Sequence, residues 1–149
     1  MIEKTMAARN SGEKRVIEWL KAWAKAIRDN DLASGRALFA EDASGFGTIT
    51  LRTDGLDDLV EGQWSRVWAN TTGFDFDWKG LSIRLSPDGL QAGVQTLWTS
   101  TGKEKTGEDR DREGRATIIL TRNSKEADWK CVHTHFSMWP NCADHELLK

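Results

Sequence analysis

A chain of 149 residues with 23 acidic and 21 basic side chains carries a net charge of −2 at pH 7, and the two signs are interspersed along the sequence. This pattern argues against a protein that binds nucleic acid or an anionic membrane. The first residues lack the apolar core of a signal peptide, and no later segment approaches the roughly 20 apolar residues of a spanning helix, so we expect a cytoplasmic protein of one domain.

The aromatic composition is unbalanced, because eight tryptophans and five phenylalanines are present without any tyrosine. This excludes a mechanism that needs a phenol as acid or hydrogen-bond donor. So many tryptophans favour a large core with a buried subunit contact, and a tryptophan-walled ligand cavity is compatible with it. The only cysteines, Cys131 and Cys142, are not expected to form a disulfide, because Cys131 has the surroundings of a small core residue.

The N-terminal part predicts a helical hairpin. Residues 1–12 are polar and are expected to fray, whereas 13–29 carry an apolar stripe at helical spacing. Asn30 can stop this helix in a left-handed conformation, and Asp31 can cap a second helix. The buried face of that second helix is expected to consist of Leu32, Leu38 and Phe39.

A short strand or irregular segment is expected over 43–51, followed by a third helix that begins after Gly55. Apolar residues at helical spacing define that helix, and Trp64 and Trp68 are four apart and so share a face. Beyond it the period changes to two, which predicts a strand. The alternating apolar residues of that strand are Phe74, Phe76 and Trp78.

The C-terminal half predicts a meander of long strands. A turn at 86–89 leads into a strand over 90–101, and strands over 115–122 and 128–138 follow. The charged segment 102–114 is interpreted as a solvated connection whose ends extend its neighbours. Pro140 should stop the last strand, and we expect a loose tail over the remaining residues, 141–149.

The last predicted strand alternates two sets of side chains, and both sets contain apolar bulk. One face would present Trp129, Cys131, His133, His135 and Ser137. The other face would present Lys130, Val132, Thr134, Phe136 and Met138. This pattern predicts a strand that is buried on both sides.

The order of elements over 15–138 resembles the nuclear-transport-factor-2-like fold. Four motifs are similar to its SnoaL-like branch, which includes ketosteroid isomerases and polyketide cyclases. These motifs are Ala37-Leu38-Phe39-Ala40-Glu41-Asp42-Ala43, Gly45-Phe46-Gly47-Thr48, Gly114-Arg115-Ala116-Thr117 and Trp129 through Ser137. Leu59-Val60-Glu61-Gly62, with Val132, His133, His135 and Ser137, also resembles the association domain of calcium/calmodulin-dependent protein kinase type II.

The resemblance implies an α+β fold for residues 13–140, a cone-shaped half-barrel with three N-terminal helices in the concave face of a strongly curved antiparallel sheet. It also implies an internal pocket and a homodimer formed through the outer face of the sheet. The expected pocket residues are Trp23, Phe39, Phe46, Trp64, Trp68, Thr134 and Phe136. The expected dimer interface contains Trp129, Cys131, His133 and His135.

The resemblance does not extend to the machinery of a steroid isomerase. The oxyanion-hole tyrosine of that enzyme corresponds to Trp23, its general-base aspartate to Gly47 and its neutral aspartic acid to Ile118. Neither Gly47 nor Ile118 can exchange a proton, so steroid isomerisation is not expected. The kinase association domain has an inward arginine where this chain has Phe136. Because Phe136 replaces that arginine, the pocket of this chain is expected to be more apolar.

The pair His133 and His135 leaves several roles open. Both could be satisfied by backbone or cross-strand partners, either could act in acid–base chemistry, or both could bind a metal ion with a third ligand. The candidates for the third ligand are Asp75, Asp77 and His145. We expect no metal and no cofactor, because nothing in the sequence fixes that ligand.

The sequence therefore predicts a protein that binds a small apolar molecule in an internal pocket. The alternatives are a noncatalytic dimeric association module, which needs only the doubly apolar last strand, and an enzyme acting on a polyketide-like substrate.

Overall fold

Helix α2 (Gly12–Arg28) is the first element of the computed structural model, which describes residues 12–140. Its apolar stripe lies against the sheet and includes Val16, Leu20 and Trp23, each no more than 2% exposed. The frayed start expected for 1–12 lies outside the described residues except for Gly12, which is already helical, and the tail expected for 141–149 lies wholly outside them. None of the helices in the described part of the chain is long and apolar enough to cross a membrane.

Local capping signals set the hairpin that follows. Asn30 has a φ of +52°, and the Asp31 carboxylate accepts a hydrogen bond from the Ser34 N–H at 3.1 Å at the start of α3 (Leu32–Ala37). The prediction that the helix continues to Phe39 is wrong. Phe39 begins strand β1 because it pairs with Cys131, and this pairing with a distant strand outweighs the helical spacing.

A single helical stretch leads from Gly55 to Trp68, as the apolar spacing predicts. It consists of α4 (Leu56–Asp58), the π-helical η1 (Leu59–Trp64) and α5 (Ser65–Trp68). Gly55 has a φ of +89° at its start, a conformation that glycine adopts readily. The rings of Trp64 and Trp68 are stacked, with centroids 4.7 Å apart.

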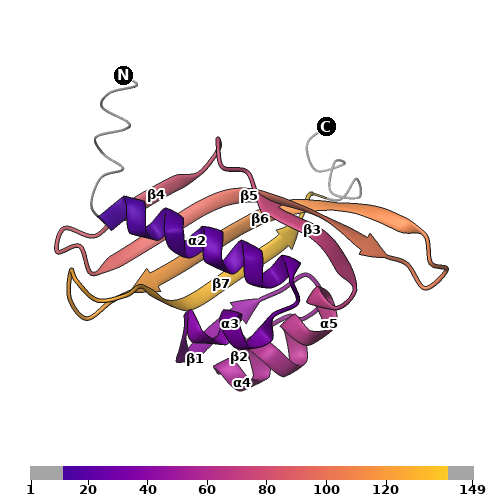
Figure 1. Cartoon of the computed structure of the whole chain (residues 1–149), viewed down its shortest axis with the longest axis horizontal. Helices are drawn as coiled ribbons and strands as arrows, with labels where there is room; N and C mark the ends of the chain where they lie inside the picture. Colours follow the sequence, from indigo (N-terminus) through magenta and orange to yellow (C-terminus); the bar gives the residue numbers. More distant parts are fainter. Residues whose placement is uncertain (1–11, 141–149) are drawn as a thin grey trace.

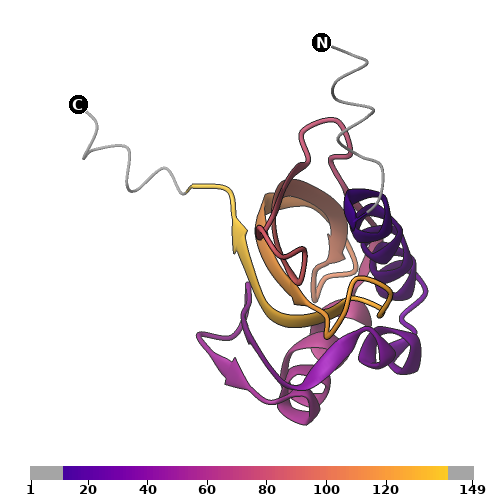
Figure 2. The ribbon, with the colours of Figure 1, turned by 90° about the vertical axis from the view of Figure 1, so that its left-hand side faces the viewer.

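One curved, seven-stranded sheet forms the rest of the fold (Figure 1). Its strands are β1 (Phe39–Phe46), β2 (Thr53–Asp54), β3 (Thr71–Phe76), β4 (Ser82–Leu85), β5 (Gln91–Lys103), β6 (Asp109–Thr121) and β7 (Lys130–Met138). The order is β2-β1-β7-β6-β5-β3, with β4 also pairing with β5. All pairs are antiparallel except β1 with β7, which is parallel. Figure 2 shows the long strands curling, with α2 lying beside the curl.

Two strand boundaries differ from the sequence prediction. The strand predicted to include Trp78 ends at Phe76, because the Asp77 carboxylate accepts hydrogen bonds from the backbone N–H groups of Lys79 and Gly80, each at 3.2 Å, and turns the chain there. The charged segment 102–114 is mostly strand rather than connection. β5 and β6 pair continuously as far as Lys103 and Asp109.

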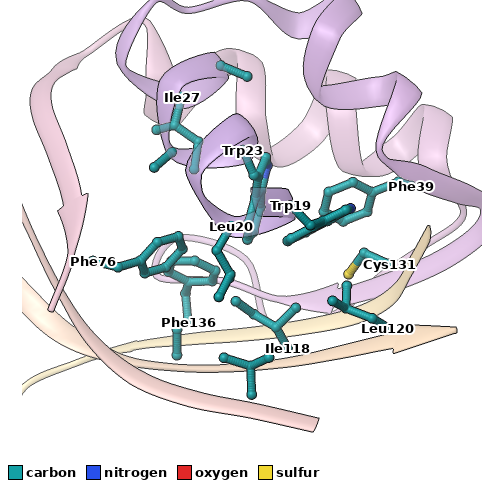
Figure 3. Packing of buried hydrophobic residues seen from close by; sticks show 14 of the residues in the cluster. Trp19, Leu20, Trp23, Ile27, Phe39, Phe76, Ile118, Leu120, Cys131 and Phe136 are labelled. Atoms are coloured by element: carbon teal, nitrogen blue, oxygen red, sulfur yellow. The ribbon is translucent and has the colours of Figure 1, made fainter. Parts of the chain in front are cut away.

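The core lies between α2 and the inward face of the sheet. Figure 3 shows Trp19, Leu20 and Trp23 directed from the helix toward side chains of the strands. Residues on β6 and β7 that complete this core include Ile118, Leu120, Cys131 and Phe136.

The expected placement of Trp129 and Cys131 on the outer face is wrong. Both belong to the core, at 3% and 0% exposure. The reason is a bulge in β7: Ile119 pairs with His133, but Leu120 pairs with Cys131, so Val132 is an extra residue and the alternation changes phase there. Among the described residues Cys131 is a free cysteine, and burial raises the pKa of its thiol.

Candidate functional site

A narrow cavity opens between the helices and the inward face of the sheet. Its volume is about 50 Å³, enough for roughly two water molecules. The lining side chains come from α2, the loop after β1, the helical stretch 59–68 and strands β3, β5, β6 and β7. They are Trp23, Ile27, Thr48, Gln63, Trp64, Val67, Trp68, Thr71, Phe74, Trp98, Arg112 and Phe136.

Aromatic rings in mutual contact form most of the walls. Trp23 lies 6.3 Å from Trp64 and 5.6 Å from Phe136 between ring centroids, and Phe136 lies 5.8 Å from Trp98. Because each ring packs on two or more others, the walls are held in place by the core itself. The Trp23 indole N–H is buried and has no hydrogen-bond acceptor among the described residues.

Arg112 is the charged residue of this cavity, and it is only 9% exposed. It projects from the inward face of β6, where its guanidinium donates a hydrogen bond to Thr48 Oγ1 at 2.8 Å and lies 5.3 Å from the Trp98 ring centroid. A second, longer hydrogen bond reaches Ser100 Oγ at 3.5 Å. Burial, and secondly the charge of Arg110, lower the pKa of Arg112. No carboxylate among the described residues forms an ion pair with it.

Gln63 is the second strongly polar group of the lining, and it is 6% exposed. Thr50 Oγ1 donates a hydrogen bond to its Oε1 at 3.1 Å, which leaves the amide NH₂ without a partner in the described part of the chain. Gly47 leaves room for this amide, since a Cβ atom at Gly47 would lie 2.6 Å from Gln63 Cδ. Arg112 and Gln63 are thus both hydrogen-bonded to the loop that follows β1.

A wider groove of about 580 Å³ adjoins the cavity and shares Thr48, Val67, Thr71 and Arg112 with it. Five cationic side chains and one carboxylate line the groove, although the whole chain is slightly acidic. The cations are Arg66, Lys103, Lys105, Arg110 and Arg112, and the carboxylate, Glu104, forms an ion pair with Arg110 at 2.9 Å. The approach to the cavity is therefore positively charged.

Four of the seven residues predicted for the pocket line this cavity: Trp23, Trp64, Trp68 and Phe136. Phe39 packs behind the wall, with its ring centroid 5.1 Å from Trp23 and 4.7 Å from Trp64.

Thr134 and Phe46 do not line the cavity either. Thr134 is fully buried against Gly45, and its hydroxyl has no hydrogen-bond partner among the described residues. Phe46 lies on the outer face, because β1 runs parallel to β7 and pairs Phe46 with His135. Alternation along β1 then directs Gly45 inward and Phe46 outward.

On the outer face, Phe46 packs edge-on against both histidines, with ring centroids 4.9 Å from His133 and 5.2 Å from His135. His133 Nδ1 is 2.8 Å from Ser44 Oγ. Burial, followed by the charges of His135 and Arg52, lowers the pKa of His133. Among residues 12–140, no third His, Cys, Asp or Glu completes a metal-binding group with the two histidines, and His145 lies beyond them.

The three positions that correspond to the isomerase machinery lie in different surroundings. Trp23 is in the cavity wall, Gly47 lies against Gln63, and Ile118 is fully buried in the core. None of the described residues that line the cavity is Asp, Glu, His, Lys or Cys. The polar chemistry that they offer is hydrogen-bond donation from a guanidinium, an amide and threonine hydroxyls.

Sequence reasoning missed Arg112, Gln63 and Trp98 as cavity residues. Arg112 belongs to a charged run that was interpreted as solvated, but it has the parity of Ala116, Ile118 and Leu120, the inward residues of the same strand. Extending that strand backward would have placed Arg112 inside. For Gln63, the signal was its helical spacing, since it lies four residues after Leu59 and four before Val67 and so shares a face with both.

Comparison with known proteins gives consistent results. The family model of the SnoaL-like domain matches residues 16–140. A nuclear transport factor 2-like protein from Salmonella enterica is 17% identical with a TM-score of 0.75, and the match covers 88% of this chain and 93% of that one. A ketosteroid isomerase-like protein from Erwinia carotovora is 15% identical with a TM-score of 0.73, covering 89% and 99%.

A Xanthomonas campestris protein described as a calcium/calmodulin dependent protein kinase II association domain is 18% identical with a TM-score of 0.72, covering 87% of this chain and 89% of that one. At these identities the likeness concerns the fold. No curated protein sequence matches the chain.

Proposed function

Because the chain belongs to the SnoaL-like domain family, and because its cavity is walled by tryptophans, we propose that it binds a small, largely apolar molecule there. The observation that carries this proposal is the continuous aromatic wall of Trp23, Trp64, Trp68 and Trp98 around an open volume. Concave, mainly apolar sites with few polar groups are typical of small-molecule binding.

The polar groups of the lining favour binding over proton transfer. Arg112 and Gln63 can orient a ligand by donating hydrogen bonds, but neither exchanges a proton near neutral pH. The alternative of an enzyme acting on a polyketide-like substrate therefore has less support, since the described lining lacks a group that could act as general base.

Thermal unfolding in the presence of small aromatic and branched aliphatic compounds, both neutral and acidic, tests the proposal. A compound that binds only the native state stabilises it by about 2.7 kcal/mol at a concentration one hundred times its Kd. We expect at least one such compound to raise Tm and to change tryptophan fluorescence, because the wall rings would contact it.

Val67→Phe should remove this response, because the larger ring would occupy the cavity that Val67 lines. The matched control is Ala69→Phe, which introduces the same ring at an exposed neighbouring position. If no compound raises Tm of the wild-type protein, or if Val67→Phe responds as strongly as the wild type, the proposal is wrong.

A second candidate function, a dimeric association module, is favoured by the outer face of the sheet. Leu97 on β5 and Ile119 on β6 are 41% and 37% exposed there, and β6 adjoins the strand of His133 and His135. Exposed apolar side chains on a regular surface are typical of subunit contacts. This function does not compete for the cavity, so one protein can have both.

A further inference from the structure

We infer that the ligand of this cavity is a small monocarboxylic acid, whose carboxylate binds the Arg112 guanidinium while its short apolar tail enters the tryptophan walls. This inference rests on the proposed function and specifies its ligand class. It is drawn from the state of Arg112, the volume of the cavity and the charge of the adjoining groove.

Arg112 has no ion pair with a described residue, whereas five arginines that are more exposed do. Each of the five contacts a carboxylate: Arg15, Arg28, Arg36, Arg52 and Arg110, with partners Asp128, Asp75, Asp57, Asp54 and Glu104. These five are far more accessible to solvent, where such pairs contribute little. Burial makes the charge of Arg112 more costly than theirs, and yet no described residue supplies a counter-charge to it.

Arg122 is equally buried and also lacks an ion pair, but its surroundings satisfy it. Its guanidinium lies 4.1 Å from the Trp129 ring centroid, and its Nε donates to Gly89 O at 2.9 Å. Arg122 lines neither the cavity nor the basic groove. Of the two buried arginines, only Arg112 combines an unneutralised charge with an accessible binding space.

The neighbours of Arg112 hold the guanidinium without neutralising it. Thr48 Oγ1 and Ser100 Oγ are uncharged acceptors, and a guanidinium has five N–H donors in a planar fork. A carboxylate can accept two of these donors side by side, which is the strongest common pairing of arginine. Gly102 leaves room for the arginine stem, since a Cβ there would lie 2.7 Å from Arg112 Cδ.

The two volumes limit the size of the acid, and the cations of the groove favour its negative charge. About 50 Å³ beside the tryptophans admits a short chain of about two or three carbon atoms, whereas the basic groove of about 580 Å³ shares the same arginine. A molecule with one apolar end and one anionic end therefore fits with its tail inward. The cations of the groove would attract an anion during its approach.

The experiment measures by calorimetry the binding of two acids and their neutral amides: propanoate with propanamide, and butanoate with butanamide. We expect each acid to bind at least about tenfold more tightly than its amide, because a hydrogen bond to a charged group contributes roughly 1.5–3 kcal/mol, a factor of about 10 to 100. This comparison uses only the wild-type protein and so does not depend on the folding of a variant.

Arg112→Met should reduce the affinity for the acids by about 10- to 100-fold and leave the affinity for the amides within about threefold. The matched control is Arg84→Met, which makes the same change of charge at an exposed position of β4 and should leave all four affinities unchanged. Inorganic phosphate is included as a probe without an apolar tail and should bind more weakly than either acid.

Amides that bind as tightly as the acids, or phosphate that competes with the acids at equal affinity, would overturn the inference but leave apolar binding intact. Failure of all the acids and amides, together with failure of the wider compound panel, would overturn the proposed function as well. The two claims are thus tested separately.

Discussion

At the scale of single residues, two buried threonines have opposite hydrogen-bonding states. Thr134 is fully buried and its hydroxyl has no partner among the described residues, whereas the Thr96 hydroxyl contacts Asp77 O at 3.2 Å and Leu97 O at 3.1 Å. A buried hydroxyl without a partner costs free energy, while a bonded one contributes to stability.

Thr134→Val should therefore raise the free energy of unfolding by about 1 kcal/mol, because valine fills nearly the same space without the hydroxyl. Thr96→Val should lower it by a similar amount, since it removes bonded oxygen at a buried site. Denaturant unfolding of both variants checks the pair. A destabilised Thr134→Val protein would show that the hydroxyl has a partner, such as an ordered water molecule.

His133 should make stability dependent on pH. Its pKa is lowered from the ordinary value of 6.5, chiefly by burial, so the native state disfavours its protonation. Below pH 6.5 the unfolded chain binds more protons at this residue than the native chain, and the free energy of unfolding falls as the pH falls. Above 6.5 the contribution is complete.

Chemical denaturation at pH values from 5 to 8, compared between the wild type and His133→Asn, isolates this effect. We expect the decrease of stability below pH 6.5 to be smaller in the variant. Equal slopes for the two proteins would contradict the assignment to His133.

At the scale of elements, two glycines in the strands differ in the space around them. A Cβ at Gly114 of β6 would lie 1.8 Å from the carbonyl oxygen of Ser137 on β7, whereas a Cβ at Gly93 of β5 would meet no atom within 4 Å. Gly114 therefore permits β6 and β7 to approach each other at the end of their pairing.

Gly114→Ala should destabilise the protein by at least about 3 kcal/mol, because the backbone must move to accept the methyl group. Gly93→Ala should change stability by less than about 1 kcal/mol and can increase it by restricting the unfolded chain. Thermal unfolding of the two variants compares them directly. Equal losses of stability would mean that the contact at Gly114 is easily relieved.

Local sequence signals predicted the boundary between the first two helices, whereas long-range pairing determined the strand positions that the sequence did not predict. The stop at Asn30 and the cap at Asp31 depend on neighbouring residues only, so the sequence revealed them. Phe39 became a strand residue through its pairing with Cys131, and a bulge at Val132 reversed the faces of the residues before it. Neither the partner of a strand nor the position of a bulge is encoded within a short window.

The cavity, too, has residues that local spacing predicted and residues that it did not. Tryptophans at helical spacing identified the helix side of the wall, because a stripe of large apolar residues must face the sheet. Arg112 escaped notice because a charged run is usually solvated, and its direction depends on how far β6 extends toward the hairpin. The family resemblance contributed the curved sheet and the pocket between it and the helices.

At the scale of the whole molecule, we predict a homodimer through the outer face of the sheet. Leu97→Glu combined with Ile119→Glu should shift the protein toward monomers in sedimentation, because each places a charge on that face. Ile49→Glu is the control, since Ile49 is exposed but lies in the loop beside the groove. A wild-type protein that sediments as a monomer at micromolar concentration would refute the prediction.

The parallel pairing of β1 with β7 bears on how the chain is made. Ser44 and His133, which meet across this pair, are 89 residues apart in sequence. During synthesis, therefore, β1 emerges long before the strand that joins it to the main sheet. Closing so long a loop costs conformational entropy before the contacts repay it, which slows folding. Until β7 emerges from the ribosome, the aromatic core lacks the side chains that β7 supplies, Cys131 and Phe136 among them, and remains partly exposed to chaperones or to aggregation.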